Sequence, residues 1–152
     1  GNAPGSKKYK EADKWTQQLK SEHAKSIADW DGGIGTKELH WLKKQLSASE
    51  KKKENVIVCS HQPLYSAVKN ELLRNAEAVR SLVESCPNVK AYFAGHTHIS
   101  EYSLHGGVNY VTFKGMVEKE ENAFAIVSIY SDHIEIKGYE KEVSRTLPLN
   151  DK

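Results

Sequence analysis

The chain has 152 residues, of which 38% are hydrophobic and 28% charged, and its formal net charge is +2. This is the size of one domain with a real core, and the mild charge does not favour nucleic acid as a partner, because such binding needs Lys and Arg clustered on one face. No apolar stretch approaches the roughly 20 residues that span a bilayer, and no charged-then-apolar leader opens the chain.

Two features of this composition leave alternatives open. Residues 50–54 read EKKKE, for which a solvated loop is favoured over a phosphate-binding patch. Cys59 lies in an apolar run, so we expect a buried thiol in a reducing compartment, the cytoplasm. A disulfide to Cys86 stays possible.

The first third of the chain is predicted to be helical. Apolar residues recur at intervals of three or four over residues 9–27, which indicates an amphipathic helix with one narrow apolar stripe. A glycine-rich turn is expected at residues 29–35. A second helix then covers residues 36–49, with Thr36 as a plausible N-cap.

The remainder is predicted to be mostly strands, with one helix at residues 67–86. The strands are expected at residues 55–61, 88–95, 108–113, 123–130 and 133–139. The first two are near-continuous apolar runs, which indicates burial on both faces, whereas the last alternates as an edge or one-sided strand does. Residues 141–152 are expected to form a polar surface tail. This order predicts one α/β domain, a layered mixed β-sheet with flanking helices.

Three histidines follow the two most apolar strands. His61 comes where Pro63 forbids continuation of the first strand, and His96 and His98 follow the second, where Gly95 allows a sharp turn. Ligands of open α/β sheets bind outside the carboxyl ends of the strands, and strands joined by a helical crossover are usually near neighbours. We therefore expect these imidazoles to converge and to ligate a metal. The other histidines considered, His23, His40 and His105, are expected to be packing, flanking or turn residues.

These motifs resemble those of a known superfamily. The strand-SHQP and strand-GHTH segments resemble the last two metal-binding motifs of the calcineurin-like metallophosphoesterases. DGGIGTKELHWLKKQL, NVIVCSHQPLY, FAGHTHISEYS and VNYVTFKGMVE resemble the manganese-dependent ADP-ribose/CDP-alcohol diphosphatases, over about residues 1–139. The resemblance implies that residues 1–152 form the C-terminal half of an α/β/β/α sandwich.

The resemblance also implies a chemistry. A pair of divalent metal ions, Mn²⁺ or else Mg²⁺, iron or Zn²⁺, would bridge the scissile phosphate, with His61 and His96 on one ion and His98 on the other. The substrate would be a nucleoside diphosphate-linked small molecule, ADP-ribose or a CDP-alcohol, whose hydrolysis releases a nucleoside monophosphate.

The sequence departs from the superfamily in its carboxylate and asparagine ligands. The Asp-x-His or Asp-x-Gln, Gly-Asp and Gly-Asn-His motifs do not occur. Three neutral imidazoles do not offset the charge of two divalent ions, and Mn²⁺ prefers oxygen donors. We therefore assign no catalytic residue and expect this chain to be inactive without an N-terminal half of the same domain as its partner.

Substrate contacts and other functions stay open at this stage. Tyr65 and Tyr102 follow the histidine loops and would stack on a nucleobase, although such tyrosines are more often packing residues. Gly33 lets a backbone approach a ligand, but a plain turn explains it equally well. The alternative functions are a non-catalytic binding module with at most one metal, and a hydrolase of another phosphoester.

Overall fold

The computed structural model describes residues 3–21, 31–68, 71–117 and 120–149, and three helices lie in these ranges. They are α1 (Lys7–Ser21), α2 (Thr36–Lys51) and α3 (Ala76–Ser85). The first two confirm the helices expected from periodicity, although His23 and the expected end of the first helix lie outside the described residues. No described helix is long and apolar enough to cross a bilayer.

The strands form two sheets. The first contains β1 (Val56–Cys59), β2 (Val89–Ala94), β4 (Val108–Thr112) and β3 (Glu101–His105) in that spatial order, and the second contains β5 (Ala123–Ile129), β6 (His133–Glu140) and β7 (Arg145–Pro148). In the first sheet β1, β2 and β4 are parallel and β3 is antiparallel to β4. The second sheet is antiparallel throughout.

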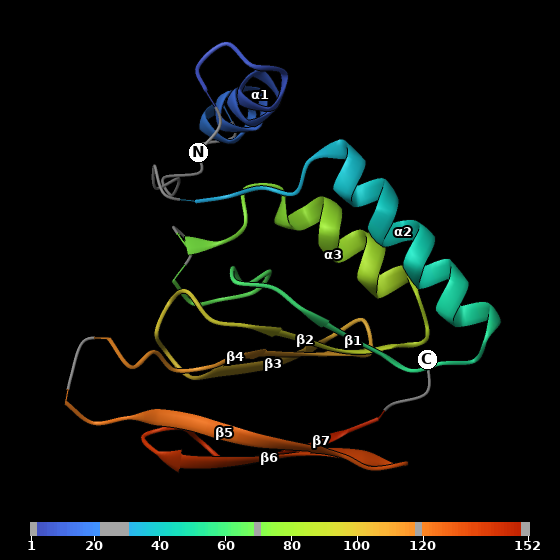
Figure 1. Ribbon diagram of the computed structural model, residues 1–152, viewed down its shortest axis with the longest axis vertical. Coiled ribbons are helices and arrows are strands. Elements are labelled where there is room, and N and C mark those ends of the chain that lie inside the picture. Colours follow the sequence, from blue (N-terminus) through green and yellow to red (C-terminus); the bar gives the residue numbers. More distant parts are fainter. Residues whose placement is uncertain (1–2, 22–30, 69–70, 118–119, 150–152) are drawn as a thin grey trace.

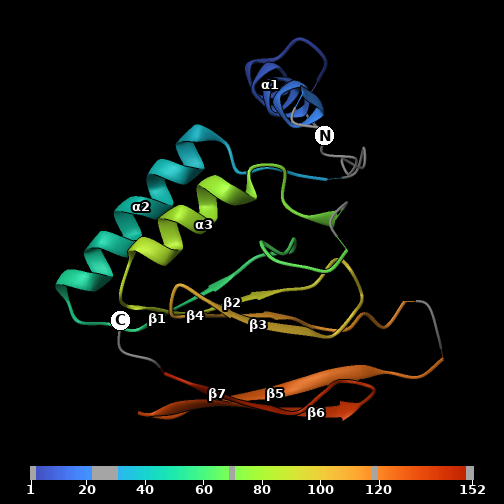
Figure 2. The same cartoon turned by 180° about the vertical axis from the view of Figure 1, so that it is seen from behind.

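The helices and sheets are stacked in layers. Helices α2 and α3 lie side by side over one face of the first sheet, and the second sheet covers its other face (Figures 1 and 2). One hydrophobic core, with Leu46, Val79 and Tyr92, lies between helices and sheet, and another, with Phe93 and Ile134, lies between the two sheets. The layered α/β fold expected from the sequence is therefore confirmed.

The two apolar strands next to the histidines differ in burial. All six residues of β2 are buried, as expected for a central strand. The expectation for β1 was wrong, because β1 stands at one edge of the described sheet and its side chains are only half-buried. Cys59 is exposed rather than buried, and Cys59 and Cys86, both described, form no disulfide.

The helix expected at residues 67–86 is shorter in the structure and begins at Ala76. Upstream of it, backbone N–H groups bond to distant segments instead of continuing a helix. Leu73 N–H donates to the Pro63 carbonyl (3.1 Å), and Arg74 N–H donates to the Gly32 carbonyl (2.9 Å). Tertiary bonds therefore override a local periodic pattern here, and they tie this segment to the histidine loop.

Three further details correct the sequence expectations. β3 was missed, because no strand was expected between residues 95 and 108. Thr36 is not the N-cap of α2: Gly35 occupies that position, while the Thr36 side chain bonds to Glu11 of α1. The segment expected as a polar surface tail contributes β7 to the second sheet and buries Glu142 and Leu147.

Candidate metal centre

The loops after β1 and β2 are held together by backbone hydrogen bonds. Ser60 N–H donates to the Phe93 carbonyl (2.9 Å), and Gly95 N–H donates to the His61 carbonyl (3.0 Å). The parallel pairing of β1 with β2 thus extends past the ends of both strands and brings the two histidine loops side by side. Sequence reasoning predicted this neighbourhood from the matched positions of the histidines at strand ends.

The imidazoles of His61 and His96 are in contact. His61 Nε2 lies 3.1 Å from His96 Nδ1, and the rings meet edge to face with centroids 4.9 Å apart. Two nitrogens that share an ion at bonds of about 2.1 Å are about 3.0 to 3.4 Å apart, for octahedral to tetrahedral angles. The observed separation fits a shared ion as well as it fits a hydrogen bond between the rings.

A buried carboxylate stands on the other side of His96. Asp31 Oδ1 is 3.5 Å from His96 Nε2, and the Asp31 side chain is only 1% exposed. Gln62 completes this network: its Nε2 donates to Asp31 Oδ1 (3.0 Å), and its Oε1 accepts from Gly32 N–H (2.7 Å). Gln62 Nε2 also lies 3.3 Å from His96 Nε2, so this ring nitrogen is engaged with Gln62 and Asp31 while Nδ1 faces His61.

Sequence reasoning missed both Asp31 and Gln62. Asp31 was grouped with a turn because two glycines follow it, and Gln62 was passed over between His61 and Pro63. The only signal for Gln62 was its position at the strand end beside a candidate ligand. Asp31 offered no local signal, since its contact with His96 spans 65 residues of sequence.

His98 is supported differently. His96 and His98 both have a left-handed backbone, with φ +71° and +56°, but the His98 ring lies on the backbone of Gly115, where an added Cβ would be 2.5 Å from His98 Cγ. Within residues 3–21, 31–68, 71–117 and 120–149, no three or more His, Cys, Asp or Glu side chains are grouped so as to hold a metal ion. The structure therefore brings His61 and His96 into contact and positions His98 by a separate packing contact.

A cleft of about 430 Å³ is lined by residues of α1, of α2 and of the end of β1. Its lining includes Asp31, Gly33, Ser60 and Arg74. Gly33 cannot carry a side chain without moving a neighbour, because an added Cβ would be 2.5 Å from the Trp15 ring. The cleft therefore adjoins both Asp31 and the loop that carries His61.

The two tyrosines considered for substrate binding line a different groove, of about 310 Å³. The Tyr65 ring stacks on His105 with centroids 4.0 Å apart, and its hydroxyl donates to Glu84 (3.0 Å). Burial, followed by the bond to Glu84, raises the pKa of the Tyr65 hydroxyl. Tyr102 is 44% exposed, and its hydroxyl donates to Asn109 (3.1 Å). Tyr65 thus has its ring face and hydroxyl engaged in packing.

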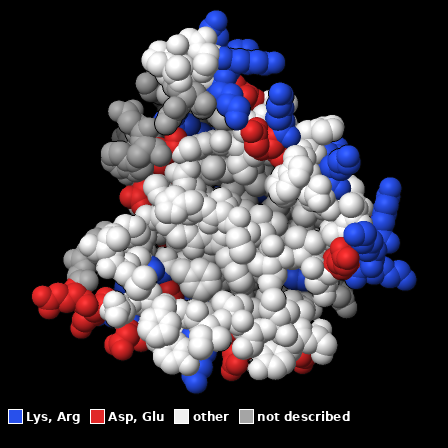
Figure 3. Space-filling model, in the orientation of Figure 1, with Lys and Arg blue, Asp and Glu red and all other residues white. Residues whose placement is uncertain are grey.

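The lysines of residues 50–54 lie at and just after the end of α2. Lys51, Lys52 and Lys53 are all exposed, and Figure 3 shows basic side chains projecting outward at the end of α2, whereas the middle of that face is largely uncharged. Lys52 is 3.9 Å from Glu54 in an exposed ion pair. This arrangement agrees with a solvated loop.

Comparisons with known proteins agree with this geometry. The family model for the calcineurin-like phosphoesterase matches residues 5–100. A manganese-dependent ADP-ribose/CDP-alcohol diphosphatase of Xenopus tropicalis is 35% identical over 127 residues, which are 80% of this chain and 37% of that protein. The Homo sapiens protein of the same name is 32% identical over 117 residues, 74% of this chain and 34% of that protein.

A solved structure extends the comparison to the fold. A dimetal phosphatase from Danio rerio superposes with a TM-score of 0.87 at 26% identity, over 99% of this chain and 53% of that one. The chain belongs to the calcineurin-like phosphoesterase family. It spans little more than a third of the curated relatives it matches, and about half of the zebrafish chain.

Proposed function

We propose that this chain supplies the histidine-bearing part of a metal-dependent hydrolase site that cleaves the diphosphate linkage of ADP-ribose or of CDP-alcohols and releases a nucleoside monophosphate. The observation that carries this proposal is the pair of nitrogens on His61 and His96, 3.1 Å apart at the carboxyl ends of two parallel strands. The names of the relatives support the choice of substrate.

The residues present fit a divalent metal ion. His61 Nε2 and His96 Nδ1 would hold one ion, and His98 would be a ligand of the second. Such ions, Mn²⁺ above all, with Mg²⁺, iron or Zn²⁺ as alternatives, supply Lewis-acid stabilisation of charge on a phosphoryl oxygen. Asp31 has a separate role in this proposal: its carboxylate, 3.5 Å from His96 Nε2, orients that ring together with Gln62, whose Nε2 is 3.3 Å from the same nitrogen.

Charge balance supports a partner segment. Neutral imidazoles leave the charge of two divalent ions uncompensated, and Mn²⁺ prefers carboxylate and other oxygen ligands. We propose that these ligands come from an N-terminal half of the same domain, and that this chain alone has negligible activity. The greater length of the relatives supports this view.

The cleft beside Gly33 is the proposed site for the nucleoside part of the substrate. It shares Asp31 with the histidine pair and includes Ser60, which directly precedes His61. Arg74, whose guanidinium donates to Thr16 (2.8 Å), lines it as well. The groove with Tyr65 and Tyr102 has weaker support as a nucleobase site because of the contacts already made by Tyr65.

The test is reconstitution. The portion of the Xenopus tropicalis relative that this chain does not match is added to the chain, and release of AMP from ADP-ribose is followed as Mn²⁺ is titrated. We expect AMP release by the mixture and almost none by either component alone. Turnover by the chain alone in the ordinary range, about 1 to 10³ per second, would contradict the need for a partner segment.

A second function has one observation in its favour. The two imidazoles in contact, those of His61 and His96, would hold one metal ion in a binding module. If the two components bind one another and Mn²⁺ but never cleave a diphosphate, the binding module is the correct function. For location we propose the cytoplasm, which the exposed thiol of Cys59 supports.

A further inference from the structure

A carboxylate is buried in the turn between β6 and β7. The Glu142 side chain is only 1% exposed, although ionised carboxylates are rarely buried without several hydrogen-bond donors. The backbone of this turn packs tightly against Gly138 of β6. An added Cβ on Gly138 would collide with the Glu142 carbonyl. Gly138 N–H also donates to Ser144 Oγ (3.0 Å). Such a turn has little freedom to withdraw the carboxylate.

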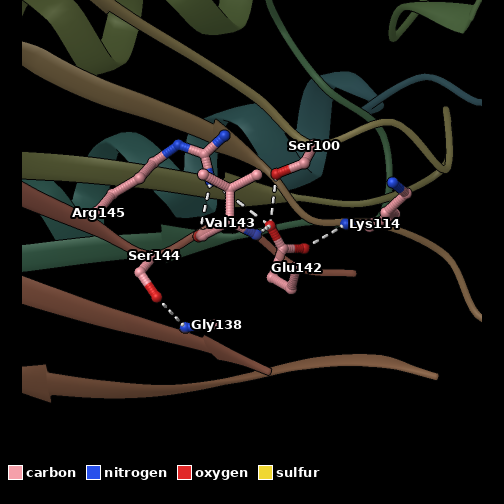
Figure 4. Close-up of polar contacts among 7 residues, drawn as sticks. All are labelled: Ser100, Lys114, Gly138, Glu142, Val143, Ser144 and Arg145. Atoms are coloured by element: carbon pink, nitrogen blue, oxygen red, sulfur yellow. Dashed lines mark hydrogen bonds and ion pairs between the residues drawn. The ribbon is translucent and has the colours of Figure 1, made fainter. Parts of the chain in front are cut away.

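The donors to Glu142 come from three separate segments. Lys114 N–H donates to Oε2 (2.7 Å), and Ser100 Oγ donates to Oε1. Within the turn, Val143 N–H donates to Oε1 (2.8 Å), and Arg145 Nη1 lies 3.5 Å from the same oxygen. Figure 4 shows these side chains and amides converging on one carboxylate between the sheets.

The two distant donors flank His98. Ser100 lies two residues after His98 on the same loop, and Lys114 directly precedes Gly115, on whose backbone the His98 ring rests. One carboxylate therefore fixes both the loop that carries the imidazole and the surface that supports it. The left-handed backbone of His98 is uncommon for a residue other than glycine, so its loop needs such outside support.

We propose that Glu142 is a positioning residue for His98: it fixes that imidazole at the sheet edge from the second sheet, without touching the ring. The inference rests on the proposed function, in which His98 is a metal ligand. It adds a residue that belongs to no metal-binding motif and lies 44 positions along the chain from His98.

The experiment compares Glu142→Ala, Glu142→Gln and the wild-type chain. The matched control is Glu140→Ala, which changes an exposed carboxylate at the end of β6, two residues before Glu142. The histidine rings of this chain are labelled with ¹⁵N. Their NMR signals are recorded first without metal, and then during addition of Mn²⁺, which broadens nearby signals, to the chain mixed with the unmatched portion of the Xenopus tropicalis relative. Amide exchange of Lys114 is measured in the metal-free samples.

Without metal, we expect Glu142→Ala to shift the His98 ring signals and to speed exchange of the Lys114 amide about tenfold or more, while Glu140→Ala does neither. Glu142→Gln should restore most of the wild-type behaviour, because its amide oxygen still accepts from Lys114 N–H. If Glu142→Ala leaves the His98 signals and Lys114 exchange unchanged, the inference is overturned.

With Mn²⁺, we expect the alanine variant to weaken broadening of His98 about tenfold, while His61 and His96 broaden as in the wild type. Equal broadening of His98 in the two proteins would overturn the inference. If Mn²⁺ broadens no ring in the wild type, the proposed metal site fails, and the metal-free signals still decide the role of Glu142. If the alanine variant does not fold, Ser100→Ala, which removes one donor, should shift the His98 signals in the same direction.

Discussion

The histidine pair and His98 lie at the same end of the first sheet but are supported by different parts of the molecule. His61 and His96 are held by the pairing of β1 with β2, and buried Asp31 lies against His96. His98 rests on the segment after β4, and that segment is bonded to Glu142 of the second sheet.

This difference shows how one sheet edge can present two independently supported groups of ligands. The contacts described for the two supports involve different side chains, so we expect a change at one to leave the other intact. In the proposed metal site, the ion held by His61 and His96 therefore depends on Asp31, and the ion held by His98 depends on the packing of the second sheet. The predictions that follow separate these two supports.

The largest effect is expected from His96→Ala. It removes Nδ1 from the pair with His61 and leaves the Asp31 carboxylate buried without this neighbour. In the reconstituted mixture we expect the rate of AMP release from ADP-ribose to fall by more than about 100-fold. This exceeds the loss of activity usually seen when a residue that only supports a metal ligand is mutated. His40→Ala, on the exposed flank of α2, is the control and should retain full activity. An active His96→Ala would show that this loop is only a turn.

A smaller loss is expected from Asp31→Asn, which keeps the side-chain volume but removes the charge beside His96. We expect Mn²⁺ affinity at the pair to fall about 10- to 100-fold, measured by titration of the His61 and His96 ring signals. The response of His98 should not change. Asp132→Asn, which alters an exposed carboxylate next to His133, is the control. Equal weakening at all three histidines would contradict independent support.

The third prediction concerns the stability of the folded protein, to which Asn109 of β4 contributes by linking the two sheets. This buried amide donates to the Lys90 carbonyl (3.0 Å) and to the Pro148 carbonyl (2.9 Å), so it joins the first sheet to β7. Asn109→Ala should lower the free energy of unfolding by about 3 kcal/mol, because buried carbonyls lose their donor. Urea denaturation measures this loss. A change below about 0.5 kcal/mol would show that the amide does not fasten the sheets.

The smallest effect concerns alkaline pH. Burial raises the pKa of the Tyr92 hydroxyl from 10.0 to about 12. The unfolded chain therefore loses this proton at lower pH than the folded protein, so the stability contribution is complete below about pH 10 and is lost as pH rises towards about 12. Urea unfolding between pH 8 and 11 should show this decline, and Tyr92→Phe should make it shallower. An identical decline in the variant would rule out Tyr92 as its source.

Local patterns predicted the parts of the fold in which residue type and environment agree. The β-branched and apolar runs gave β1, β2 and β4, and their matched ends predicted that His61 and His96 would be neighbours. β3 escaped prediction because its sequence, EYSLH, is largely polar and its side chains are half-buried or exposed. The helix before Ala76 failed because its backbone donors bond to other segments.

The supports of the site were beyond sequence reasoning for a different reason. Asp31 reaches His96, and Glu142 reaches Ser100, across long stretches of chain. Neither carboxylate has a periodicity or a spacing that marks it, because its role depends on how the layers stack. Glu142 even lies in a segment whose composition predicts a solvated tail.

The central claim is that His61 and His96 share one metal ion and that His98 is supported separately. The most direct measurement is anomalous X-ray diffraction at the manganese edge from crystals of the reconstituted protein with Mn²⁺. The account predicts a peak about 2.1 Å from both His61 Nε2 and His96 Nδ1, and a second peak beside His98. A single peak bound by all three imidazoles, or no peak at the pair, would contradict it.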